Sequence, residues 1–119
     1  MKRQTVLALT LMLSLAVMAA AADPYYEKDK DTSRTLVGRV TNQHDDPLPN
    51  AVVYLSNTRT NVVKSYIVPQ DGSYRFPALS PNIDYEVYAQ FNGRKSDTKS
   101  VSHFDSRQQV NINLHIDTK

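Results

Sequence analysis

The sequence of 119 residues contains no cysteine and no tryptophan, and it has only three glycines. Without cysteine there is no disulfide, no thiolate nucleophile and no attachment site for a lipoprotein anchor. With so few glycines there is also no glycine-rich phosphate-binding loop. The fold must therefore be stabilised by its apolar core alone.

The charge balance excludes another class of partner. The chain has 14 basic and 12 acidic side chains, and Lys2 and Arg3 are the only charged residues among the first 22. Removing that segment leaves 12 basic against 12 acidic side chains. A chain without excess positive charge has no general attraction to nucleic acid or to anionic lipid. We therefore predict no nucleic-acid partner.

The first 22 residues have the order of a secretory signal peptide. A basic start at Lys2 and Arg3 precedes a largely apolar stretch over residues 6–18, and four alanines follow at 19–22. The apolar stretch of about 13 residues is shorter than the ~20 that a membrane-spanning helix needs. We expect cleavage after Ala22, no membrane span after signal removal, and an exported chain in the periplasm or the extracellular medium.

Residues 23–33 are mostly charged and polar, and their only large apolar side chains are Tyr25 and Tyr26. Such a segment buries too little apolar surface to offset the entropy of ordering it. We therefore predict a flexible N-terminal arm over residues 23–33, followed by one domain over residues 34–119.

From Arg34 onward the apolar residues recur with a period of two, which is typical of β-strands. Turn residues at 69–72 and at Asn92-Gly93 separate the alternating segments, and no segment has helical periodicity. The pattern predicts an all-β, seven-stranded antiparallel β-sandwich. Gly38, inside the first strand, is expected to leave room for a large side chain from the opposite sheet. The predicted core includes Val53, Leu55, Phe76, Leu79, Tyr85, Val87, Ile112 and Leu114.

Four short motifs resemble the carboxypeptidase regulatory-like domains. They begin at Leu36, Pro47, Asp71 and Pro81, and they read LVGRVT, PLPNAVVYL, DGSYRFPAL and PNIDYEVYA. The resemblance covers residues 34–116 and implies the transthyretin-like (prealbumin-like) seven-stranded sandwich. It carries no catalytic residues. Modules of carbohydrate-binding-like fold are related to these domains, so the resemblance leaves glycan binding open by analogy.

Catalytic and metal-binding patterns are missing from the sequence. His44, His103 and His115 occur singly, without the spacing of a metal site, and there is no nucleophile elbow around a serine. Asp45 and Asp46 beside His44 offer oxygen ligands for calcium, but a solvated polar turn is the favoured interpretation. We predict no enzyme activity, no cofactor and no metal.

Three tyrosines form the candidate binding site. By strand parity, Tyr54, Tyr66 and Tyr88 are expected to point away from the core on the second, third and fifth strands, on one outer face. Exposed aromatic rings suit either a protein partner or the apolar face of a sugar. The favoured function is a noncatalytic secreted module in protein interaction or cell-envelope structure, with a cell-envelope protein as partner. The alternative is a carbohydrate-binding module that uses the tyrosine face on a glycan.

Overall fold

The computed structural model describes residues 32–119, so the predicted signal peptide and most of the predicted arm lie outside the described residues. The described part is all β, and among its residues no helix is long and apolar enough to cross a membrane. Its nine strands are β1 (Arg34–Thr41), β2 (Val52–Asn57), β3 (Val63–Ile67), β4 (Ser73–Leu79), β5 (Tyr85–Phe91), β6 (Arg94–Lys95), β7 (Lys99–Val101), β8 (Gln109–Asn111) and β9 (Leu114–His115).

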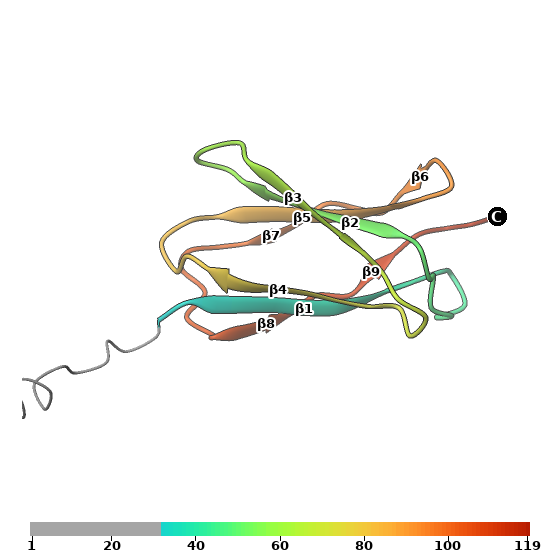
Figure 1. The fold of residues 1–119 in the computed structure, drawn as a ribbon, viewed down its shortest axis with the longest axis horizontal. Coiled ribbons are helices and arrows are strands. Elements are labelled where there is room, and N and C mark those ends of the chain that lie inside the picture. Colours follow the sequence, from blue (N-terminus) through green and yellow to red (C-terminus); the bar gives the residue numbers. More distant parts are fainter. Residues whose placement is uncertain (1–31) are drawn as a thin grey trace, which may run out of the picture. The chain divides into compact units, whose positions relative to one another are not determined.

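The strands form the two packed sheets of a β-sandwich, which confirms the predicted architecture (Figure 1). One sheet has the order β4-β1-β8, with β9 also paired to β1. The other has the order β3-β2-β5-β6, with β7 also paired to β5. β8 and β9 lie one after the other along β1, and β6 and β7 do the same along β5.

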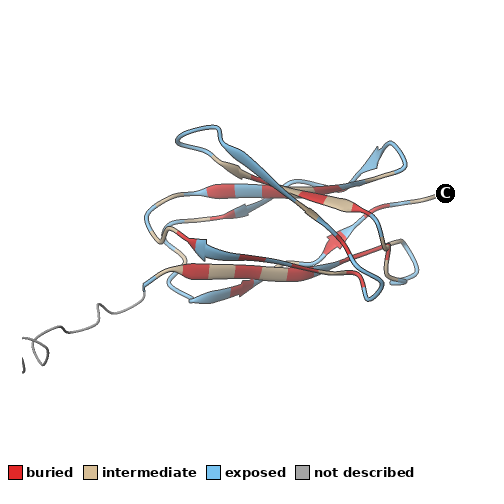
Figure 2. Ribbon diagram, in the orientation of Figure 1, coloured by how far each residue is buried: buried red, intermediate tan, exposed pale blue. Residues whose placement is uncertain are grey.

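The core lies between the sheets, where buried and more exposed residues alternate along the central strands (Figure 2). Seven of the eight predicted core residues are buried. The eighth, Ile112, is partly buried and packs against the others. The period-two pattern therefore identified the core correctly, because each strand places alternate side chains on opposite faces.

Nine strands replace the predicted seven because one short strand, β6, is added after β5 and one predicted strand is divided in two. The Asn92-Gly93 turn, with φ of 49° and 79°, forms the hairpin between β5 and the short β6. The expected last strand over residues 110–116 is divided into β8 and β9 at Ile112 and Asn113. The apolar alternation continues through this break, and so the sequence did not reveal it.

The sheets are not wholly antiparallel, so that part of the prediction is wrong. β1 pairs in parallel with both β8 and β9. The chain leaves β7 in one sheet and enters β8 in the other, where the backbone N–H of Thr35 donates to the carbonyl of Gln108 at 2.8 Å. Because β8 enters beside the start of β1, it runs in the same direction as β1.

Gly38 makes room for backbone within its own sheet. The expectation that it leaves room for a side chain from the opposite sheet is therefore wrong. A Cβ at this position would lie 1.7 Å from the Ile112 carbonyl oxygen and 2.8 Å from the Tyr74 ring. The Tyr74 hydroxyl donates to the same carbonyl at 2.6 Å, and burial raises the pKa of this tyrosine. Gly38 therefore lets the interruption between β8 and β9 pack tightly on β1.

Candidate functional site

Tyr54 and Tyr88 lie side by side on the outer face of the five-stranded sheet. They are direct partners in the β2–β5 register, and their ring centroids are 5.3 Å apart with the planes at 29°. The ammonium group of Lys95, on the neighbouring β6, lies 4.4 Å from the centroid of the Tyr88 ring. The two rings and the cation thus form one stacked cluster.

Apolar side chains on β2 and β3 extend this cluster across the sheet. The β2 residues on this face each have a direct partner on β3, so Val52 lies beside Ile67 and Ser56 beside Val63. Ile67 and Val63 are exposed to 69% and 55%. We call this surface the tyrosine face, and it consists of Val52, Tyr54, Val63, Ile67, Tyr88 and Lys95.

Tyr66 does not belong to the tyrosine face, and the prediction of three tyrosines on one outer face is wrong. Its partner on β2 is the buried Val53, which places it on the inner side of β3. Its ring packs edge-on against Phe76, with the centroids 5.9 Å apart. β3 is an edge strand that exposes Val63 and Ile67, so its apolar residues did not mark the core side.

The polar turn that contains His44, Asp45 and Asp46 is stabilised by its own hydrogen bonds. The Asn42 side-chain oxygen accepts from the backbone N–H of His44 at 2.8 Å and of Asp46 at 3.0 Å. Asp45 adopts a positive φ of 66° in this turn. Among residues 32–119, no three histidine or acidic side chains gather in a way that would hold a metal ion.

Arg34 is a buried residue that the sequence interpretation missed. It is only 2% exposed, and its guanidinium donates to four backbone carbonyls at distances of 2.7 to 3.4 Å. The carbonyls belong to Ser80 and Ile83 before β5 and to Ser102 and Asp105 after β7. The signal was present, because Arg34 has the same parity as the core residue Leu36. Its role is to hold two loops at one end of the sandwich.

Three aspartates have a lowered pKa, and each is engaged in local hydrogen bonds. The backbone N–H and the ring of His103 lower the pKa of Asp84, with the ring nitrogen 2.8 Å from the carboxylate. The backbone N–H and the hydroxyl of Ser73 lower the pKa of Asp71. Hydrogen bonds from Arg107 lower the pKa of Asp105 to about 2. A general acid at neutral pH needs a raised pKa, so these carboxylates serve as hydrogen-bond acceptors.

A protein-family model matches most of the described domain, in agreement with the order of the motifs and the two-sheet architecture. Residues 35–117 match the family model of the carboxypeptidase regulatory-like domain. The chain belongs to this family. The resemblance seen in the four motifs is thereby confirmed. Comparison with curated proteins gave no significant match.

Solved structures share the fold of this carboxypeptidase regulatory-like domain at low sequence identity. A dioxygenase domain from Streptomyces sp. SirexAA-E is 16% identical, with a TM-score of 0.53 over 77% of this chain and 86% of that one. BcpA, the major pilin subunit of Bacillus cereus, is 11% identical, with a TM-score of 0.56 over 74% of this chain and 31% of that one. A DUF3823 family protein from Parabacteroides merdae is 19% identical, with a TM-score of 0.51 over 74% of this chain and 47% of that one. This chain thus spans less than half of the latter two proteins.

Proposed function

We propose that this chain is an exported, noncatalytic module that docks a cell-envelope protein through the tyrosine face. The observation that carries the proposal is the exposure of Ile67 and Val63 beside the stacked pair of Tyr54 and Tyr88. Large apolar side chains gathered on one solvent-facing sheet are characteristic of an interaction surface. Membership of a regulatory-like family supports a role without catalysis, and the leader over residues 1–22 supports export.

A protein partner fits this surface better than a glycan does. A sugar ring stacks on an open aromatic face, but Tyr54 and Tyr88 already cover part of each other, and Lys95 lies against the Tyr88 ring. The exposed apolar surface of the tyrosine face belongs instead mainly to Ile67 and Val63, and aliphatic side chains suit an apolar protein surface. The pilin subunit of similar fold is consistent with a module that acts through protein contacts.

The test is capture of cell-envelope proteins by the immobilised protein, compared with retention on immobilised polysaccharides. We expect a partner to be captured, and the variants Ile67→Lys and Tyr54→Ala/Tyr88→Ala to lose it. Phe104→Ala is the matched control, because Phe104 is 85% exposed and lies in the loop after β7. The tyrosine pair stabilises the fold by about 1 kcal/mol, so its removal should lower the melting temperature by about 4–8 °C without unfolding the protein.

Two results would contradict the proposal. Capture that survives both variants would place the docking site elsewhere. Retention on a neutral polysaccharide that depends on Tyr54 and Tyr88 would favour the glycan-binding alternative. Export is tested separately by the intact mass of protein recovered outside the cytoplasm, which should begin at Asp23.

A further inference from the structure

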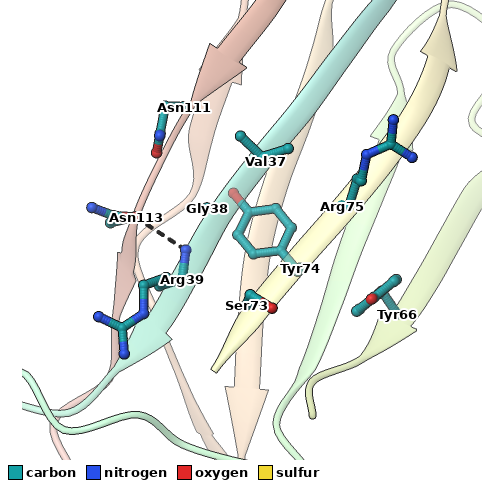
Figure 3. Close-up of a pocket in the computed structure, with 9 residues that line it drawn as sticks. All are labelled: Val37, Gly38, Arg39, Tyr66, Ser73, Tyr74, Arg75, Asn111 and Asn113. Atoms are coloured by element: carbon teal, nitrogen blue, oxygen red, sulfur yellow. Dashed lines mark hydrogen bonds between the residues drawn. The ribbon is translucent and has the colours of Figure 1, made fainter. Parts of the chain in front are cut away.

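The outer face of the four-stranded sheet carries an open groove of about 480 Å³ (Figure 3). Two cross-strand rows form its floor. Arg75, Val37 and Asn111 are direct partners on β4, β1 and β8. In the next row Ser73 is the partner of Arg39, and the Asn113 side-chain oxygen accepts from the backbone N–H of Arg39 at 3.0 Å. Strands are about 4.8 Å apart, so each row spans about 10 Å.

The groove contains several hydrogen-bond donors that the protein does not use. Within residues 32–119, the guanidinium of Arg75 and the carboxamide of Asn111 have no hydrogen-bond or ion-pair partner. In the described part of the chain, the guanidinium of Arg39 donates only to the Asp71 carbonyl, at 3.2 and 3.4 Å. Both arginines are exposed.

No described carboxylate lines the groove. The Asp71 carboxylate lies beside the groove: it accepts from the backbone N–H and the hydroxyl of Ser73, at 3.0 and 2.7 Å, and its pKa is lowered by these hydrogen bonds and by the charge of Arg39. The groove therefore presents two cations and two carboxamides to a ligand, and the Asp71 carboxylate beside it is engaged with Ser73.

We propose that this groove binds an acidic polysaccharide whose sugar units carry carboxylates, such as a polyuronate. A guanidinium matches a carboxylate in bidentate geometry; Arg75 lies beside Val37 on β4, and Arg39 lies two residues farther along β1. The carboxamides of Asn111 and Asn113 can both donate to and accept from sugar hydroxyls. The half-buried Val37, between these polar groups, gives the apolar face of a sugar ring a place to rest.

A saccharide fits the groove better than an acidic peptide does. Extended peptides bind sheets by pairing with the backbone of an exposed edge strand. The groove lies over β1, which is hydrogen-bonded to β4 on one side and to β8 and β9 on the other. Because the backbone of β1 is paired on both sides, a ligand that lies across β1 is bound by side chains, such as those of Arg75 and Asn111.

The test is affinity electrophoresis of the purified protein through gels that contain polygalacturonate, with dextran as the neutral polymer. We expect polygalacturonate, and not dextran, to retard the protein. The gels contain about 0.15 M salt, at which electrostatic attraction between charges farther apart than ~8 Å is largely screened. Arg75→Gln should weaken binding about tenfold, the usual effect of one charge-assisted hydrogen bond, and Asn111→Ala should weaken it less. Arg94→Gln is the matched control, since it removes the same charge from the exposed β6 on the other sheet.

Several results would overturn the inference. An equal loss of retardation in Arg75→Gln and Arg94→Gln would show that the binding is a nonspecific effect of charge. Retardation by dextran would show that the carboxylates of the polymer are not needed. Stronger competition by poly-glutamate than by galacturonate oligomers would assign the groove to an acidic peptide. Loss of retardation in Tyr54→Ala/Tyr88→Ala, with Arg75→Gln unaffected, would move the site to the tyrosine face. No retardation by polygalacturonate would refute it outright.

Discussion

Replacing Gly38 by alanine should be among the most damaging single substitutions in this protein. The added Cβ would lie 1.7 Å from the Ile112 carbonyl oxygen, whereas real contacts of this kind are at least 3.0 Å, so the segment must move by more than about 1 Å. That movement breaks the hydrogen bond from the Ile112 N–H to the Val37 carbonyl, at 2.9 Å, and the one from the Tyr74 hydroxyl, at 2.6 Å.

The expected cost follows from these two contributions. Overpacking of a core costs about 1–3 kcal/mol, and two hydrogen bonds contribute about 1 kcal/mol each. The sum, about 3–5 kcal/mol, is a large part of the typical total of about 5–15 kcal/mol. Urea unfolding followed by circular dichroism measures it.

Gly93→Ala is the matched control for Gly38→Ala. Gly93 has a φ of 79°, and a Cβ there would meet no atom within 4 Å. The control should therefore cost only about 1–2 kcal/mol, from the left-handed backbone conformation. If Gly38→Ala proves no more destabilising than Gly93→Ala, the close approach of Ile112 to β1 is not what this glycine permits.

Two further predictions concern the core and the response to acid. Phe76→Ala should lower the free energy of unfolding by about 3–5 kcal/mol, because it leaves a cavity beside Tyr66 and Tyr74. The control Phe104→Ala, at an exposed position, should change it by no more than about 0.5 kcal/mol. Equal urea midpoints for the two variants would contradict the burial of Phe76. Acid should destabilise the protein below about pH 3.9, the ordinary pKa of aspartate, because Asp71, Asp84 and Asp105 have lowered pKa values in the folded state. Such groups contribute their stability above the unfolded pKa and lose it as the pH falls through the folded pKa. Asp84→Asn should therefore show a smaller drop in urea midpoint between about pH 5 and pH 2.5, and an undiminished drop would show that Asp84 does not contribute.

Local patterns predicted the parts of the fold that depend on neighbouring residues alone. Alternation identified the core, because strand geometry places every second side chain on the same face. Asn92-Gly93 identified its hairpin, because both residues tolerate positive φ. Asp71 accepts from the backbone N–H of Ser73, two residues on, at 3.0 Å, as aspartate commonly does in turns.

The features that the sequence did not reveal depend on contacts between distant segments. The parallel pairing of β1 with β8 depends on where the chain crosses between the sheets, which alternation does not encode. Phe76 and Leu79 are both buried although their parity differs, because Ala78, with a φ of 61°, lies where the β1–β4 register shifts. Alternation on an edge strand such as β3 is also ambiguous, since either face can carry apolar groups.

The candidate site was predicted only in part for the same reasons. Tyr54 and Tyr88 lie on the central strands β2 and β5, where the inner residues are unmistakably apolar, so their outward parity was correct. Tyr66 lies on the edge strand, and its assignment failed. The groove could not be foreseen, because Arg39, Arg75 and Asn111 come together only through the order β4-β1-β8.

The buried Arg34 affects where this domain can bind a partner. Sandwich domains often bind through the loops at their ends, because loops tolerate change. Here Arg34 donates to carbonyls of the loop before β5 and of the loop after β7, so these loops are tied to the core at one end. A partner that required either loop to rearrange would have to break charge-assisted hydrogen bonds, each stronger than a neutral one. The outer sheet faces need no such rearrangement, and so binding there can change without loss of the fold.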